Sequence, residues 1–340
     1  MARKTKINDI TNPELLKQVN PENTRLVNDY ISYLKSTQKA ETTIKVYRND
    51  LDIAMVWCLK NNSNKFFINW TKRDIVSFQN WLINENGNSA ARVRRIKATL
   101  SSMSNFVENI LDDEYPDFRN IIHKVENPVN QPTREKTVLE DEQLEDLLNE
   151  LVNKKKYEKA CMLALAMSSG RRKSELVRFK VSYFDDKNII LGSLYKTPEK
   201  VRTKGRGNGK YIHCYTLVSR FKPYLDLWLK ERSERGIDSE WLFPMPEDPT
   251  KHIKAETLNS WANTFTRILG VPFYFHCLRH YFVTYLIKAG IPEDVVTEII
   301  AWDSAEMCRL YTDLSTEDRI SEYFSADGIV NKGTTKLQNL

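Results

Sequence analysis

One short segment places two arginines, a residue type suited to phosphate groups, at a predicted corner of the chain. Residues 168–176 read Ser-Ser-Gly-Arg-Arg-Lys-Ser-Glu-Leu. One predicted helix ends at Gly170 and another begins near Lys173, so Arg171 and Arg172 lie at a sharp turn. The planar fork of donors on an arginine matches a phosphate. A solvated surface turn can also carry two arginines, so this segment alone does not decide its role.

A second segment combines histidine with arginine. On a helix, His276, Arg279 and His280 share one face. Two histidines four residues apart could bind a metal, but no Glu or Asp stands at the spacing of a zinc protease. The surrounding helix is apolar, so these polar groups need partners, whether structural or catalytic.

The glycines from Gly205 to Gly209 lack the spacing and the Ser or Thr of a nucleotide-binding P-loop. Basic residues crowd between Lys196 and Lys210, which predicts a β-hairpin turn that carries cations. Such a turn serves solubility or contacts phosphates.

Taken in order, these segments resemble the tyrosine recombinase (phage integrase) family. The family's T-G-x-R-x-S-E-L box matches Ser169–Leu176 and puts its catalytic arginine at Arg172. Its H-x-L-R-H box matches His276–His280 in full. Its G-H-x(8)-Y-T box matches Ala301–Thr312 in spacing, although Ala replaces Gly and Trp302 replaces the usual histidine. Some active members carry Trp there.

The resemblance implies DNA strand exchange without ATP, metal or any other cofactor. Tyr311 would attack a backbone phosphate and form a 3′-phosphotyrosine bond. Arg172 and Arg279 would neutralise the transition state. His276 would assist proton transfer or bind the phosphate, whereas the indole N–H of Trp302 can only donate a hydrogen bond.

The resemblance also assigns a hairpin lysine that protonates the leaving 5′-oxygen. Lys204 is the first candidate because Thr203-Lys204-Gly205 precedes the turn, and Lys210 is the second. The residues expected to orient the site are Glu175 and His280. The hairpin cations expected to grip the DNA backbone are Arg202, Arg206 and Lys210.

Apolar periodicity predicts the elements that position these residues. Four helices are expected between residues 23 and 107, followed by helices and two strands near residues 188–192 and 210–216. The predicted fold class is mainly α with a small antiparallel β-sheet: a four-helix core-binding (SAM-like) domain and an α+β tyrosine recombinase catalytic domain. The expected boundaries are a flexible arm (1–20), a helical DNA-binding domain (21–115), a linker (116–136), a catalytic domain (137–327) and a mobile tail (328–340).

The helix from Ser89 to Val107 turns a row of cations away from its apolar stripe, and these are expected to meet DNA: Arg92, Arg94, Arg95 and Lys97. A solvated basic face is the alternative. The family implies a clamp around double-stranded DNA at a specific site, a homotetramer on paired sites and an accessory protein that bends DNA.

The composition agrees with a folded protein that binds nucleic acid. The 340 residues include 41% hydrophobic and 28% charged residues, with 51 Lys+Arg against 45 Asp+Glu. No apolar run is long enough for a membrane span, and no signal peptide is evident, so a cytoplasmic, nucleoid-associated protein is expected. The main expectation is the integrase of a mobile element; the alternatives are a catalytically silent DNA-binding protein of the same fold and a type IB topoisomerase-like enzyme.

Overall fold

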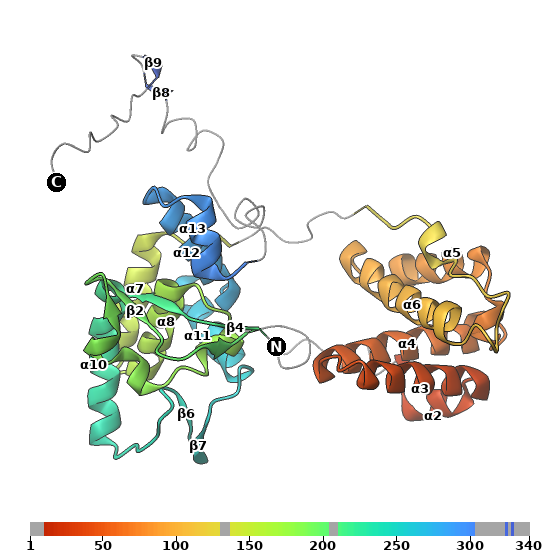
Figure 1. Cartoon of the computed structure of the whole chain (residues 1–340), viewed down its shortest axis with the longest axis horizontal. Coiled ribbons are helices and arrows are strands. Elements are labelled where there is room, and N and C mark those ends of the chain that lie inside the picture. The colour runs from red at the N-terminus through yellow and green to blue at the C-terminus, as the bar shows by residue number, and fades with distance from the viewer. Residues whose placement is uncertain (1–9, 130–136, 204–209, 303–323, 326–327, 330–340) are drawn as a thin grey trace. The chain divides into compact units, whose positions relative to one another are not determined.

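The computed structural model describes residues 10–129, 137–203, 210–302, 324–325 and 328–329 (Figure 1). The chain divides near residue 135 into an N-terminal and a C-terminal compact unit. Within the described part of the chain, no helix is long and apolar enough to cross a membrane.

The N-terminal unit is helical, with helix α4 against α3 and α6. Side-chain caps start several of its helices: Asn20 accepts from Glu22 N, and Thr71 and Asp74 form a capping box. Its apolar stripes meet in one core. The helices are α2 (Pro13–Gln18), α3 (Pro21–Ser36), α4 (Glu41–Asn61), α5 (Lys72–Asn80) and α6 (Ala90–Ile110), with one π-helical turn (Trp81–Glu85).

Two expected boundaries are wrong for the described residues. The expected flexible arm contains helix α2, which Asn12 caps and which packs against α4. The expected linker from residue 116 begins too early, because Ile122 is 2% exposed in the N-terminal core. Asn120 fixes the same stretch through bonds to Ser101. Prolines and polar residues in both segments hide these apolar anchors from a periodicity argument.

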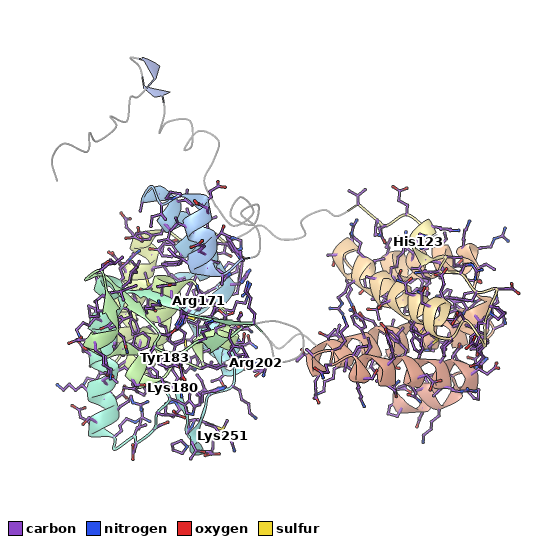
Figure 2. All side chains as sticks on the ribbon, viewed as in Figure 1. His123, Arg171, Lys180, Tyr183, Arg202 and Lys251 are labelled. Carbon is purple, nitrogen blue, oxygen red and sulfur yellow. The ribbon has the colours of Figure 1, made fainter. Side chains whose placement is uncertain are left out.

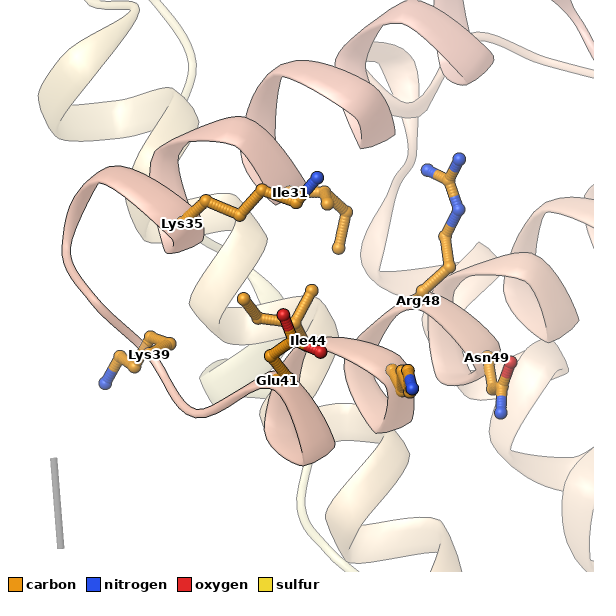
Figure 3. Close-up of a pocket in the computed structure, with 8 residues that line it drawn as sticks. Ile31, Lys35, Lys39, Glu41, Ile44, Arg48 and Asn49 are labelled. Carbon is orange, nitrogen blue, oxygen red and sulfur yellow. The ribbon is translucent and has the colours of Figure 1, made fainter. Parts of the chain in front are cut away.

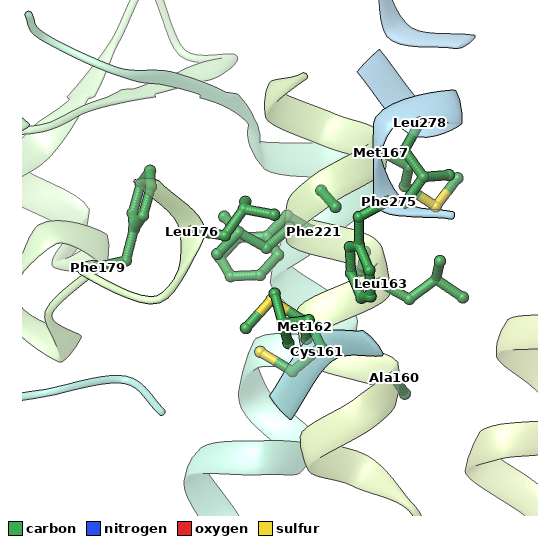
Figure 4. Close-up of a cluster of buried hydrophobic side chains, with 14 of the residues drawn as sticks. Ala160, Cys161, Met162, Leu163, Met167, Leu176, Phe179, Phe221, Phe275 and Leu278 are labelled. Atoms are coloured by element: carbon green, nitrogen blue, oxygen red, sulfur yellow. The ribbon is translucent and has the colours of Figure 1, made fainter. Parts of the chain in front are cut away.

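Helix α8 (Tyr157–Ser169) forms the centre of the C-terminal unit and packs against α7 (Asp141–Asn153), α10 (Val218–Glu234) and α12 (Phe275–Lys288). It is buried on every side from Ala160 to Ser169, and its apolar side chains meet those of neighbouring elements in the core (Figure 4). Its C-terminal end therefore has a fixed position, and that end leads into the arginine-bearing turn.

Short antiparallel strands flank this helical core. Strands β1 (Ile189–Ile190), β2 (Leu194–Lys196) and β5 (Tyr215–Leu217) form one sheet in the order β1-β2-β5. The two-stranded pairs are β3 (Val201–Arg202) with β4 (Tyr211–Ile212), β6 (Pro244–Met245) with β7 (Asp248–His252), and β8 (Phe324–Ser325) with β9 (Gly328–Ile329). The remaining helices are α9 (Lys173–Leu176), α11 (Thr257–Leu269) and α13 (Glu293–Ile300). The predicted class, mainly α with small antiparallel sheets, is confirmed.

Candidate active site

A glycine turn at the end of α8 leads into the two adjacent arginines, which precede α9. Gly170 ends α8 in the left-handed conformation, with φ of 59°. A Cβ atom at this position would stand 2.5 Å from Phe282 Cδ1 and 2.9 Å from Ile300 Cδ1. Only glycine fits both the backbone angle and this close approach. The turn then buries Arg171 and leaves Arg172 partly exposed.

Arg172 is held from behind by a buried carboxylate. Its backbone N donates to Glu175 Oε2 at 3.1 Å and its Nη1 donates to Glu175 Oε1 at 3.1 Å. Burial alone raises the pKa of Glu175, but Arg171, the Thr203 hydroxyl and Arg172 outweigh it and hold that pKa below its usual range. The lowered pKa favours a carboxylate that holds the guanidinium, and the orienting role of Glu175 in catalysis stays a prediction.

Arg171 has a structural role that the sequence did not predict. It is 1% exposed, and it donates to the backbone carbonyls of Ser169 and Ile299. Figure 2 places it inside the C-terminal unit. Arg171 thus ties the turn to the end of α13. The only sequence signal is its place in the box, one residue before Arg172, since nothing else distinguishes two adjacent arginines.

Helix α12 brings Arg279 to the same turn. Arg279 is 1% exposed, and it donates from Nη1 to the Gly170 carbonyl at 2.9 Å and from Nη2 to the Ile300 carbonyl at 3.2 Å. These bonds join α12 to the α8–α9 turn and to the end of α13. The plane of the Arg279 guanidinium is therefore fixed by the fold.

His276 lies one turn before Arg279 and presents a neutral ring. Its ring centroid is 5.4 Å from that of His280, with the planes at 89°. Removal of water from part of the ring, followed by the nearby His280, Arg279 and Arg172, lowers the pKa of His276 to about 4. At neutral pH the ring keeps one nitrogen lone pair, which can accept a proton or a hydrogen bond. His280 is buried against this ring, a position that suits orienting it.

Trp302 completes the described part of the site. Helix α13 ends at Ile300 and Ala301 caps it in the left-handed conformation. The backbone N of Trp302 donates to the Thr297 carbonyl at 3.0 Å. The indole is 8% exposed, and its ring centroid lies 5.1 Å from the Arg279 guanidinium carbon, which is cation–π geometry. Arg172 and His276 also line one pocket of about 500 Å³.

The described residues of the predicted active-site boxes thus meet in space across α9, α12 and the end of α13. Among the predicted residues, Lys204, Arg206 and Tyr311 lie outside the described part of the chain. In that part, no cluster of three or more His, Cys, Asp or Glu side chains is arranged to hold a metal ion.

Comparison with known proteins decides the family. The model of the phage integrase family matches residues 137–318, more than half of the chain. The model of the N-terminal SAM-like domain of phage integrases matches residues 26–117. The chain belongs to the phage integrase family.

Named relatives of this phage integrase family chain span most of its length. The SPbeta prophage-derived recombinase-like protein YomM of Bacillus subtilis strain 168 is 28% identical over 295 residues, which cover 84% of this chain and 85% of YomM. Tyrosine recombinase XerD of Staphylococcus saprophyticus is 25% identical over 304 residues, covering 85% of this chain and 94% of XerD. The structure of XerH bound to palindromic difH substrate has the same fold, with a TM-score of 0.64, 18% identity and coverage of 93% and 91% of the two chains.

In this integrase-family chain, the predicted DNA contacts of α6 need correction. Lys97 is wrong as a DNA contact, because it is 3% exposed and its Nζ donates to Gln79 Oε1, Val125 O and Glu126 O at 2.7, 2.8 and 3.1 Å. A buried ammonium with three acceptors holds the α6 helix to the following chain. All three donors of this ammonium have protein acceptors, so none is left for a phosphate.

Among the neighbouring arginines of α6, two form ion pairs within the unit and one is exposed. Arg92 and Arg95 both pair with the fully buried Asp50, at 2.6 and 3.1 Å. Arg95 remains half exposed, and Arg94 is exposed with one bond to the Pro128 carbonyl. Arg92 and Arg95 therefore first neutralise Asp50, and their contact with DNA stays a prediction, as does that of Arg94.

A basic pocket on the N-terminal unit was not predicted from the sequence. It lies between α3 and α4, has a volume of about 810 Å³ and is shown in Figure 3. Its charged lining consists of Lys35, Lys39, Lys45 and Arg48 against Glu41. These cations are spread over the end of one helix and the start of the next, so no single helical face displays them. We call this feature the α3–α4 basic pocket.

In the C-terminal unit, the hairpin base carries two of the predicted DNA contacts. Arg202 pairs with Tyr211 across β3 and β4, and Lys210 O accepts from Thr203 N at 2.7 Å. The side chains of Arg202 and Lys210 are exposed, and Figure 2 shows Arg202 near the edge of the unit. Their exposure suits a backbone contact, which stays a prediction.

Proposed function

We propose that this chain is a site-specific tyrosine recombinase, the integrase of a mobile genetic element. It cleaves and rejoins DNA strands through a 3′-phosphotyrosine on Tyr311, without ATP. The observation that carries the proposal is the joining of Arg172, His276, Arg279 and Trp302 around one turn. Two arginines and a neutral histidine in one place suit a phosphodiester that gains negative charge as it reacts.

The first step forms one ester and breaks another. The phenolic oxygen of Tyr311 attacks the phosphorus and its proton passes to His276, whose low pKa keeps the ring able to accept it. The 5′-oxygen of the DNA leaves and takes a proton from Lys204, with Lys210 as the alternative donor. The phosphate ester is kept in the adduct, so no nucleotide cofactor is required.

The second step reverses the first with a different strand. A 5′-hydroxyl from a partner duplex attacks the phosphotyrosine and releases Tyr311. Throughout, Arg172 and Arg279 donate to the non-bridging oxygens, while Trp302 packs on Arg279 and can donate from its indole N–H. Exchange between two duplexes needs four such cleavages, which supports a homotetramer on paired sites. An accessory protein that bends DNA is a further expected partner.

Phosphate contacts on both units would supply the affinity for double-stranded DNA. On the N-terminal unit, we assign this role to the α3–α4 basic pocket together with Arg94. On the catalytic unit, the hairpin cations Arg202, Arg206 and Lys210 would serve. The proposed place of action is the cytoplasm, at the nucleoid. The prophage-derived name of one relative supports a mobile element.

Covalent trapping tests the proposal. The wild-type protein and Tyr311→Phe are incubated with DNA flanking the gene, without ATP or metal, denatured and separated on a gel. We expect a protease-sensitive DNA adduct with wild type and none with Tyr311→Phe. Tyr274→Phe is the matched control. Tyr274 is an exposed tyrosine that lines the pocket with Arg172 and His276, and its variant is expected to keep the adduct.

Two outcomes contradict this assignment. Specific DNA binding without any adduct favours a silent DNA-binding protein of the same fold. Relaxation of supercoiled DNA without site preference favours a type IB topoisomerase-like enzyme. Sequencing of the trapped DNA identifies the recombination site for later kinetic work.

A further inference from the structure

We propose that Thr203 is a positioning residue, whose hydroxyl locks the Arg172 guanidinium against Glu175 and ties it to the base of the β3–β4 hairpin. This inference rests on the proposed function of Arg172. It concerns a residue to which neither the sequence boxes nor the predicted mechanism gives a role.

Three side chains close a ring of contacts. Arg172 Nη1 donates to Glu175 Oε1 at 3.1 Å and to Thr203 Oγ1 at 3.3 Å. The Thr203 hydroxyl in turn donates to Glu175 Oε1. The hydroxyl hydrogen therefore points at the carboxylate, and an oxygen lone pair faces the arginine. A methyl group in place of the hydroxyl satisfies neither partner.

Burial makes the ring depend on this hydroxyl. Thr203 is 7% exposed and Glu175 is fully buried, so water cannot easily take over the lost bond. The Thr203 hydroxyl is also one of the groups that hold the pKa of Glu175 down. Its removal leaves Glu175 with one donor fewer, raises that pKa and lets the Arg172 guanidinium turn away from its fixed plane.

The same residue belongs to the hairpin. Its backbone N donates to the Lys210 carbonyl at 2.7 Å, next to the pairs Val201–Ile212 and Arg202–Tyr211. Arg178 Nη1 donates a hydrogen bond to the Arg202 carbonyl at 2.9 Å. The base of the hairpin and the arginine-bearing turn are thus bonded to each other, and a shift of one must move the other.

The test compares Thr203→Val, which keeps the shape but loses the hydroxyl, with Thr203→Ser, which keeps the hydroxyl. Thr203→Ala removes the hydroxyl without a second methyl group, in case valine perturbs folding. Thr197→Val is the matched control: Thr197 is 3% exposed and its hydroxyl accepts from Cys214 N at 3.0 Å, a bond that involves neither Arg172 nor Glu175. The full-length variants are assayed on the duplex recovered from the wild-type adduct.

We measure the rate of adduct formation at saturating protein, the Kd for the duplex, the melting temperature and the rate from pH 5 to pH 8. Thr203→Val and Thr203→Ala should lose roughly 10- to 100-fold in rate, as for other groups that orient a reacting side chain, with unchanged Kd. Their rate should also begin to fall at a higher pH than in wild type, because Glu175 takes up a proton more readily. Thr203→Ser should restore both properties, and Thr197→Val should change only the melting temperature.

Wild-type rate and pH dependence in both Thr203→Val and Thr203→Ala would overturn the inference while leaving the recombinase assignment intact. A rate loss in Thr203→Ser equal to that in Thr203→Val would also overturn it, since the hydroxyl would then not be the cause. If the wild-type protein forms no adduct with any DNA, the proposed function itself fails, and the inference fails with it.

Discussion

The substitution Lys97→Met separates a structural lysine from a DNA-binding one. The Lys97 ammonium donates three bonds, to Gln79 Oε1 and to the carbonyls of Val125 and Glu126. Hydrogen bonds to a charged group contribute about 1.5–3 kcal/mol each. Methionine fills similar space and avoids burying a charge, which offsets part of the loss, so a net loss of about 2–4 kcal/mol is expected. For a small unit this lowers the melting temperature by roughly 10–30 °C.

The assay combines thermal unfolding with DNA binding at several salt concentrations. Lys97→Met should melt earlier yet keep the wild-type slope of log K against log salt. Lys35 is exposed and lines the α3–α4 basic pocket. Lys35→Met should keep the wild-type melting temperature and reduce the slope by about 1, as the loss of a phosphate contact does. A Lys97→Met protein with wild-type melting and a reduced slope would refute the structural role.

Three further predictions concern the C-terminal unit. Because the pKa of His276 is about 4, the rate of adduct formation should show no loss from its protonation between pH 7 and pH 5; an inflection near 6.5 that disappears in His276→Gln would contradict this. Gly170→Ala should destabilise the protein by about 2–4 kcal/mol in denaturant unfolding, since its Cβ meets Phe282 and its φ is positive. Arg171→Met should cost about 3–5 kcal/mol by the same measurement, because Glu175 loses a buried counter-charge; unchanged unfolding in either variant would contradict the assigned packing.

Periodicity predicted elements and their buried faces well, because both are local properties. The H-x-L-R-H box was expected on a helix, and it lies on α12, which runs from Phe275 to Lys288. The order of the boxes also predicted which side chains would gather. Arg172, Glu175, His276, Arg279 and Trp302 do meet, since the family fold brings those distant segments together.

Periodicity could not predict which residues distant in sequence would pair with the cations of α6. On α6, the positions of Arg92, Arg95 and Lys97 suggested one DNA-facing row. Asp50, which lies on α4 more than 40 residues earlier, forms ion pairs with Arg92 and Arg95. The carbonyl groups of Val125 and Glu126, which follow the helix, accept hydrogen bonds from the Lys97 ammonium. A basic helical face therefore indicates where cations lie and leaves open whether an acid from another helix has already neutralised them.

The arginines show most clearly how the fold prepares the chemistry. A guanidinium holds its donors in one rigid plane, so two bonds in that plane orient the whole group. Arg279 is oriented in this way by the carbonyls of Gly170 and Ile300, and Arg172 by Glu175 and Thr203. Both planes are therefore set by main-chain and buried groups before a phosphate enters, and little reorganisation remains for the reaction itself. In the proposed mechanism, the end of α13 and the hairpin base therefore control how well the two arginines stabilise the reacting phosphate, although neither needs to touch that phosphate.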